Sequence, residues 1–216
     1  MILGIYCAGN LGREIYEIAC RINKVNRRWE EIVFLDDVYE GDMFYGARVL
    51  KPDIISFEAP NIEAVIANGT PKHRQALREK VSKLGIPLTN LIDPTSIISS
   101  TATLGNGVIV TPFSTICCDV CIGDNVHIQS YVRVGHDIVI GNDSVLSSNV
   151  AIGGKTKVGM QTYVGLGAVI RDGLYIGNNS IISMGAVVHT DVDDGVTVVG
   201  SPARVSKRNE SGTIFR

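Results

Sequence analysis

The chain has 216 residues, with 22 acidic and 20 basic side chains and a formal net charge of −2. This balance, without a basic stripe, argues against nucleic acid or an anionic membrane surface as a partner. No apolar run approaches the ~18 residues that a membrane-spanning helix needs. The first residues lack the layout of a signal peptide, and the odd number of cysteines, five, favours reduced thiols in a cytoplasmic protein.

Residues 1–90 show alternating strand and helix patterns. Short apolar runs at 2–6, 32–35 and 64–67 predict strands, and apolar spacing over 11–24 predicts a helix. A second helix is predicted over 71–84, because proline suits the first turn of a helix. We therefore predict a small α/β domain of Rossmann-like type over residues 1–90, with ligands at the carboxyl ends of its parallel strands.

A glycine-containing turn, Cys7-Ala8-Gly9-Asn10-Leu11-Gly12, follows the first predicted strand. It occupies the place of a dinucleotide-binding fingerprint, with Cys7 at the first glycine position. Its N–H groups and the next helix N-terminus would favour a phosphate, and Asp36 and Asp37 could accept hydrogen bonds from ribose or base hydroxyls. A nucleotide-sugar fits a domain of about 90 residues better than a dinucleotide. The alternative is a purely structural turn with solvated aspartates.

A strict six-residue period governs the chain from Ile92 to Val188. Every sixth residue is aliphatic: Ile92, Ile98, Leu104, Val110, Ile116, Ile122, Ile128, Val134, Ile140, Leu146, Ile152, Val158, Val164, Ile170, Ile176, Ile182 and Val188. The residue two positions before each is small or aliphatic from Ser96 to Ala186, and residues two apart in a strand share a face. This period indicates a solenoid whose short strands stack around one core.

Glycine follows the large aliphatic residue at eight of the 17 repeat positions: Gly105, Gly123, Gly135, Gly141, Gly153, Gly159, Gly165 and Gly177. We interpret these glycines as corner residues, since glycine lets the backbone turn at low steric cost. Residues 91–216 are therefore predicted to form a β-solenoid of strands and corners. The pair Cys118 and Cys121 fits packing on these coils better than an isolated zinc site.

Four histidines are candidates for acid–base chemistry: His73, His127, His136 and His189. His73 lies on a predicted helix, and the repeat places His127 on an outward-facing strand position. His136 comes just after a corner glycine, points outward and has Asp137 beside it. A neutral imidazole is a suitable general base near pH 7, and an adjacent carboxylate can raise its basicity and hold its orientation. Taken alone, an exposed His–Asp pair is more often plain surface.

Five motifs occur in order along the two predicted domains: Gly9-Asn10-Leu11-Gly12-Arg13-Glu14, Phe34-Leu35-Asp36-Asp37, Ile66-Ala67-Asn68-Gly69, Gly135-His136-Asp137 and Val199-Gly200-Ser201-Pro202-Ala203-Arg204. With the repeat, they make nearly the whole chain resemble the bacterial sugar acetyltransferases that join a Rossmann-like domain to a left-handed parallel β-helix of hexapeptide repeats. That family includes nucleotide-4-aminosugar N-acetyltransferases and sialic acid O-acetyltransferases. The resemblance implies the left-handedness, whereas the general rule for parallel connections would predict the opposite.

The resemblance also implies roles for individual residues. His136 would be the general base and Asp137 the acid that supports it. The nucleotide-sugar pocket would be formed by Gly9, Asn10, Leu11, Asp36, Asp37 and Gly69. Acetyl-CoA would lie along the β-helix between two subunits of a homotrimer, near Gly154, Leu166 and Met184, and no metal is implied. Some relatives have a histidine where this chain has Leu11 or Val145.

The mechanism that we hypothesise is direct transfer, with the acceptor attacking the thioester carbonyl as His136 removes its proton. The N–H of Gly154 would stabilise the oxyanion, and proximity would supply much of the acceleration. Cys117 and Cys118 are poor candidates for nucleophiles, because no histidine is placed in sequence to activate them. We favour an amine acceptor over sialic acid, since a free sialic acid carboxylate would want a cationic partner and Arg13 is the obvious cation at the turn.

Three other classes of function remain as alternatives. A metal-dependent hydratase of the carbonic anhydrase type needs three converging imidazoles, and the repeat brings only His127 and His136 near one another. A non-catalytic solenoid that binds ice or a partner would repeat outward threonines, whereas the outward positions here are mixed and charged. A nicotinamide-linked enzyme would need the full dinucleotide site.

Overall fold

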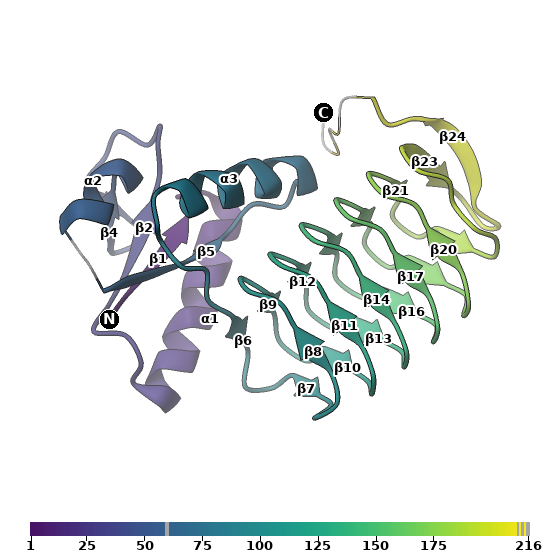
Figure 1. The fold of residues 1–216 in the computed structure, drawn as a ribbon, viewed down its shortest axis with the longest axis horizontal. Helices are drawn as coiled ribbons and strands as arrows, with labels where there is room; N and C mark the ends of the chain where they lie inside the picture. The colour runs from purple at the N-terminus through teal and green to yellow at the C-terminus, as the bar shows by residue number, and fades with distance from the viewer. Residues whose placement is uncertain (59–60, 211, 213, 215–216) are drawn as a thin grey trace.

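The computed structural model describes residues 1–58, 61–210, 212 and 214, and it contains an N-terminal α/β part followed by a long parallel β-helix (Figure 1). This confirms the predicted fold class. None of the helices in the described residues is both long and apolar enough to cross a membrane.

The α/β part is built on a five-stranded sheet of order β3-β4-β2-β1-β5. Its strands are β1 (Ile2–Tyr6), β2 (Glu31–Leu35), β3 (Met43–Phe44), β4 (Ala47–Leu50) and β5 (Ile62–Ile66), and its helices are α1 (Asn10–Asn26), α2 (Pro52–Glu58) and α3 (Pro71–Lys83). All neighbours in the sheet pair in parallel except β3 with β4. The three predicted strands and two predicted helices are confirmed, whereas β3, β4 and α2 lie in a segment without a clear sequence pattern.

The apolar stripe of α1 explains why the helix packs on this sheet. Ile15, Ile18 and Ile22 follow one helical face, are buried, and share a cluster with Leu3 and Phe34 of the sheet. Gly12 lies on the same helix, and a Cβ there would come 2.3 Å from the carbonyl oxygen of Cys7. Glycine at this position therefore allows the helix to start close against the end of β1.

The β-helix consists of two-residue strands that stack into three flat faces. The first face contains β6 (Leu91–Ile92), β9 (Ile109–Val110), β12 (His127–Ile128), β15 (Val145–Leu146), β18 (Tyr163–Val164) and β21 (Ile181–Ile182). The second contains β7 (Ile97–Ile98), β10 (Thr115–Ile116), β13 (Arg133–Val134), β16 (Ala151–Ile152), β19 (Val169–Ile170) and β22 (Val187–Val188). The third contains β8 (Thr103–Leu104), β11 (Cys121–Ile122), β14 (Val139–Ile140), β17 (Lys157–Val158) and β20 (Tyr175–Ile176).

Both predicted inward rows form the core of the β-helix. From Val108 onward, every residue of the two rows is buried, and the partly exposed members belong to the first coil. Hydroxyls in the smaller row bond to backbone carbonyls, as when the Ser144 hydroxyl donates to Gly159 at 2.8 Å and Thr162 donates to Gly177 at 2.8 Å. These bonds satisfy polar groups that would otherwise be costly to bury.

The reason that we gave for the corner glycines is wrong. None of the eight has the positive φ of a tight corner; that conformation falls two residues later, at positions such as Asn125, Asp137 and Asp143. The glycines are needed instead because the next coil lies against them: a Cβ on Gly135 would sit 2.8 Å from the backbone nitrogen of Gly154. Their spacing therefore reflects coil stacking, while asparagine and aspartate, which tolerate left-handed backbone, occupy many of the corners.

A C-terminal hairpin closes the far end of the first face. β23 (Val196–Val199) pairs in parallel with β21, and β24 (Arg204–Arg208) pairs antiparallel with β23. This hairpin breaks the hexad rhythm and was not predicted.

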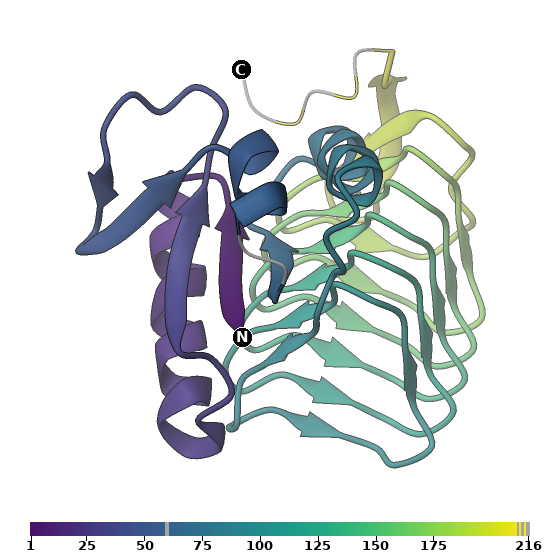
Figure 2. The same ribbon diagram turned by 60° about the vertical axis from the view of Figure 1, so that its left-hand side comes forward.

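The N-terminal domain packs against the first face and the corner between the third and first faces (Figures 1 and 2). Arg74 of α3 is fully buried there and donates to the carbonyl and side-chain oxygens of Asn125 at 2.6–2.8 Å. Arg78 forms a two-point ion pair with Asp143. Burial lowers the pKa of Arg74 to about 10, which leaves the guanidinium charged near neutral pH.

This docking changes the environment predicted for His127. Its strand position faces outward, as expected, but the N-terminal domain covers it and its side chain has no exposed surface. An outward position in the repeat therefore does not leave His127 exposed. Its burial depends on the docking of the N-terminal domain, which the local repeat does not encode.

Candidate active site

His136 and Asp137 form a hydrogen-bonded pair on the corner between the second and third faces. Nδ1 of His136 lies 2.7 Å from Oδ2 of Asp137, and both side chains are about half exposed. Because a carboxylate only accepts, it favours the tautomer with the proton on Nδ1, which leaves Nε2 as a free base. Asp137 has the positive φ of 56° typical of these corners. The conformation of the corner therefore fixes the backbone of Asp137 beside His136.

Gly154 lies one coil beyond His136 on the same corner. A Cβ at Gly154 would sit 2.7 Å from Cε1 and Nε2 of the imidazole, so the absence of a side chain makes room for the ring. Within the described residues, no hydrogen bond is recorded for the N–H of Gly154, although its carbonyl accepts from Gly173. Gly154 and the imidazole of His136 therefore lie side by side on this corner.

Leu166 and Met184 lie on a different corner, between the first and second faces. They are 54% and 77% exposed, and exposed apolar side chains that gather on one corner mark a surface that could be covered. A single chain does not bring them to His136. On the same corner, Phe113 and Tyr131 stack with ring centroids 5.2 Å apart and extend the exposed apolar surface.

Cys118 is nearer to His136 than the sequence suggested. It holds the equivalent corner position one coil earlier, and its carbonyl oxygen accepts from the N–H of Asp137 at 3.1 Å. No hydrogen bond is recorded between its thiol and the imidazole in the described part of the chain, so the structure gives no sign of an activated nucleophile. All five cysteines carry free thiols.

A cavity of about 320 Å³ opens at the carboxyl ends of β1, β2 and β5, where the α/β fold predicts a ligand. Its lining includes the predicted Asp36 and Asp37. Sequence reasoning missed its other polar walls, which are Tyr6, Cys7, Asn68 and His73. Adjacency to the strand ends was the signal that could have found Tyr6 and Asn68.

Asp36 and Asp37 are not simply solvated. Asp36 accepts from the backbone N–H groups of Ala8, Val38 and Tyr39 at 2.8–3.0 Å and so ties the glycine turn to the end of β2. Asp37 accepts from the Tyr6 hydroxyl and from Lys80. Although burial alone would raise it, hydrogen bonds from Lys80 and Tyr6 hold the pKa of Asp37 below its ordinary value.

Gly9 is the N-cap of α1 and has extended backbone. No side chain caps the helix, and its first turn contains no acidic residue. These N–H groups, together with the helix dipole, suit a phosphate. Leu11 approaches Gly69 from this turn, with Cδ2 at 3.9 Å from the Cβ position of Gly69, and Asn10 accepts from Arg13.

Cys7 adopts a φ of 90° in the turn, where fingerprints usually have glycine. Burial raises the pKa of its thiol to about 11, so the thiol is neutral and unreactive near pH 7. The alternative of a metal centre on the coils lacks a ligand cluster: no group of three or more His, Cys, Asp or Glu side chains converges among the described residues. His127 lies on the first face and His136 on the opposite corner.

Comparison with known protein families matches both parts of the chain. The PglD N-terminal domain family matches residues 3–81, and the bacterial transferase hexapeptide family, described as six repeats, matches residues 119–154. No protein of curated function matches the sequence.

Solved structures similar to the chain extend over both parts. The acetyltransferase domain of PglB from Neisseria gonorrhoeae FA1090, in complex with acetyl coenzyme A, is 27% identical with a TM-score of 0.88, covering 95% of this chain and 98% of that one. PerB from Caulobacter crescentus, in complex with CoA and GDP-perosamine, is 26% identical with a TM-score of 0.86, covering 95% and 97%. WeeI from Acinetobacter baumannii AYE is 28% identical with a TM-score of 0.67, covering 95% and 100%.

Proposed function

Because the chain is a sugar acetyltransferase of the hexapeptide-repeat class, we propose that it transfers the acetyl group of acetyl-CoA to the amino group of a nucleotide-linked 4-amino-deoxysugar. The observation that carries the proposal is the His136–Asp137 pair, 2.7 Å apart on an open corner above Gly154. The complexes of similar enzymes with acetyl-CoA and with GDP-perosamine support the choice of donor and acceptor class.

In the proposed reaction, His136 is the general base. The acceptor amine attacks the thioester carbonyl carbon, and Nε2 of His136 takes the proton that the nitrogen loses. The C–N bond forms, the C–S bond breaks, and the imidazolium returns the proton to the departing CoA sulfur. Asp137 accepts from Nδ1–H throughout, so it orients the ring and stabilises the positive charge.

Gly154 is the proposed oxyanion donor. Its N–H belongs to the residue that faces the imidazole, and a donor fixed beside the base can stabilise the charge that develops on the carbonyl oxygen. Because the base and the oxyanion donor lie on adjacent coils, the stacking of the coils, rather than a mobile loop, fixes the distance between them.

We propose that the working enzyme is a homotrimer with sites between subunits. The N-terminal domain covers the first face, whereas His136 lies on the corner opposite that face, so one chain cannot bring its own acceptor cavity to its own base. The exposed apolar corner that carries Leu166 and Met184 supports the same arrangement. A neighbouring copy would place its His136 beside that corner.

Acetyl-CoA is then proposed to lie along this groove. Leu166 and Met184 are two and three coils beyond Ser130 on their corner, which corresponds to ~10 and ~14 Å at the spacing of stacked strands. An extended thiol-bearing arm could follow that line of exposed side chains. Residues 1–90 would bind the acceptor nucleotide through Gly9, Asn10, Leu11, Asp36, Asp37 and Gly69, and residues 91–216 would bind the donor.

The test is a thiol-release assay with acetyl-CoA against a panel of UDP-, dTDP-, GDP- and CMP-linked sugars that includes 4-amino sugars, together with free sialic acids. We expect thiol release with at least one nucleotide 4-amino sugar and acetyl on its amine by mass spectrometry. Release with sialic acids alone would replace the proposal by sugar O-acetylation, and release with no acceptor would contradict it.

A further inference from the structure

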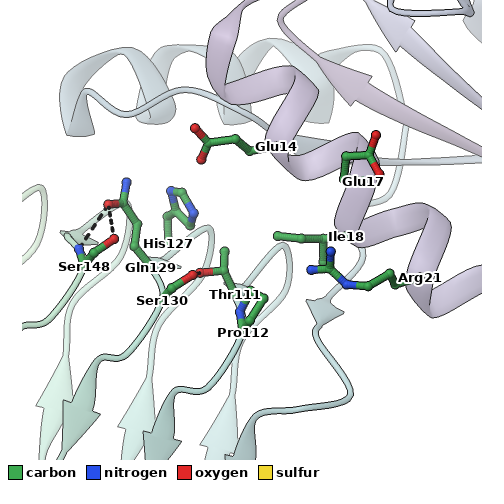
Figure 3. A pocket seen from close by; sticks show the side chains of 10 residues that line it. All are labelled: Glu14, Glu17, Ile18, Arg21, Thr111, Pro112, His127, Gln129, Ser130 and Ser148. Atoms are coloured by element: carbon green, nitrogen blue, oxygen red, sulfur yellow. Dashed lines mark hydrogen bonds between the residues drawn. The ribbon is translucent and has the colours of Figure 1, made fainter.

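A second polar cavity, of about 290 Å³, lies between α1 and the first face of the β-helix (Figure 3). Glu14, Glu17 and Arg21 of α1 line one side, and His127, Gln129 and Ser130 belong to the other. The predicted nucleotide site does not include this cleft, although both begin at the N-terminal end of α1.

His127 is the anomalous residue of the cleft. Its ring has no exposed surface, and neither ring nitrogen has a hydrogen-bond partner among the described residues. Burial, and then the charge of Arg74, lowers the pKa of His127 to about 3. The ring is therefore neutral near pH 7 and offers one N–H donor and one nitrogen acceptor.

The neighbours of His127 on the stack show what a purely structural residue would look like. Ile109 and Val145 pair with it from the coils on either side, and both are fully buried. An aliphatic side chain would fill this position without unsatisfied polar groups, and each such group is costly to bury. A histidine that breaks a local packing rule without a visible compensation is a marker of function.

Two further polar groups point into the same cleft. The Gln129 side chain accepts from the N–H of Ser148 at 3.1 Å through Oε1, so its amide nitrogen is turned toward the gap (Figure 3). Glu14 extends from α1 over the β-helix, above Gln129 and His127 (Figure 3). The cleft thus presents an amide donor, a neutral imidazole and a carboxylate.

The charge of the cleft selects the chemistry of its ligand. Glu14 and Glu17 are acidic, and the cation in the lining, Arg21, is held by Asp93 at 2.7 Å. A ligand carboxylate would meet repulsion here, whereas hydroxyls and an amine would find partners. Glu14 lies five residues after the N-cap Gly9, about 7.5 Å along the helix at 1.5 Å per residue, within reach of a sugar whose phosphate binds at that N-terminus.

We propose that this cleft binds the amino-sugar ring of the acceptor, with a ring hydroxyl bonded to His127 and the amine side of the sugar facing Glu14. The inference rests on the proposed function and names residues that decide its acceptor. It assigns His127 and Glu14 as specificity-determining residues and makes an uncharged or amine-bearing hexose the favoured ligand over a sugar acid.

The test compares His127→Leu, Glu14→Gln and the control Glu30→Gln in the full chain. Glu30→Gln removes the same charge from the same domain, but Glu30 does not line the cleft and its side chain is exposed. Calorimetry would measure the Kd of the nucleotide 4-amino sugar that reacts fastest in the panel, and of its nucleoside diphosphate alone. KM for acetyl-CoA and the Tm would be measured in parallel.

We expect His127→Leu and Glu14→Gln each to weaken binding of the nucleotide-sugar by roughly tenfold, the value of one buried hydrogen bond or close ion pair. Kd for the nucleoside diphosphate and KM for acetyl-CoA should not change, and Glu30→Gln should match the wild type. The Tm of His127→Leu should stay the same or rise, because the variant removes unsatisfied polar atoms.

Two results would overturn the inference. A lower Tm in His127→Leu with an unchanged Kd for the nucleotide-sugar would show a structural histidine, and no change in either would show an imidazole that bonds to ordered water only. Neither of these results changes the thiol release that we expect from the wild type with a nucleotide 4-amino sugar. Failure of the proposed function is different, because the wild type would then release no thiol with any nucleotide 4-amino sugar, and the cleft would lose its proposed ligand as well.

Discussion

The β-helix and the N-terminal domain place their polar residues by different rules. In the β-helix, position in the hexad decides which side chains form the core, and this register places His136 and His127 on outward positions of a repeat that runs from Ile92 to Val188. In the N-terminal domain, polar groups gather at strand ends, and Asp36 is used to hold the turn itself. A repeat therefore locates candidate residues by their register, whereas an α/β sheet locates them by where its strands stop.

The largest effect is expected on kcat, when the proposed general base on the β-helix is removed. His136→Ala should lower kcat by roughly 10²–10⁴-fold, the usual contribution of a general base. Its Tm should stay within a degree or so of the wild type, because the side chain is half exposed. Steady-state kinetics and thermal unfolding check the two halves of this expectation.

Asp137→Asn is the matched control for that experiment. Asparagine tolerates the positive φ of this corner, so that a smaller fall in kcat at unchanged Tm would isolate the carboxylate. Near-normal turnover in His136→Ala would remove the assignment of the base.

The next effect concerns the buried His127 and acid stability. In the unfolded chain this imidazole titrates near its ordinary value, whereas burial lowers its folded pKa to about 3. Between pH 6.5 and 3 the unfolded state therefore binds one more proton, and the free energy of unfolding should fall as pH is lowered, by up to about 1.4 kcal/mol per pH unit.

Urea unfolding from pH 6.5 to 4.5 would measure this slope. The fold also lowers the pKa values of Asp37 and Asp93. The pH window lies above the range in which these two carboxylates stop contributing to the free energy of unfolding. His127→Leu should flatten the slope by about the predicted amount. Equal slopes in the two proteins would mean that His127 becomes charged without unfolding.

The smallest expected effect separates two neighbouring glycines of the β-helix. Gly135→Ala places a Cβ against the backbone of the next coil, which cannot move, and should destabilise the fold by about 1–3 kcal/mol. Gly154→Ala meets only the exposed imidazole of His136. It should change the unfolding free energy less but lower kcat by displacing the base, and equal destabilisation by the two substitutions would contradict the distinction.

Much of the fold follows from the sequence because its determinants are local. The hexad rows predicted the strands of the coils, and apolar spacing predicted α1 and α3. The segment with β3, β4 and α2 gave no signal, since β3 has two residues and β4 four, too few for a period. The glycines at the corners were found in the right places, but their cause lies in contacts between residues about eighteen apart.

Part of the candidate site could be predicted from the sequence. His136, Asp137 and Gly154 fall on one corner because the repeat fixes their register, so the sequence could bring them together. The burial of His127 depends on the way the N-terminal domain docks on the β-helix, with Arg74 as one anchor, and no sequence pattern near residue 127 predicts that docking. Likewise, Leu166 and Met184 can meet His136 only across chains, which a single sequence does not describe.

One turn of the solenoid has a consequence for assembly. Residues 125–142 make a single coil, and that coil carries Asn125, one anchor of the N-terminal domain, as well as His127 and His136. Rotation about an axis parallel to the long axis of the β-helix leaves every residue at the same height. In any ring of identical subunits built that way, the proposed base of one copy is level with the proposed acceptor cleft of the next, whatever the number of coils added beyond.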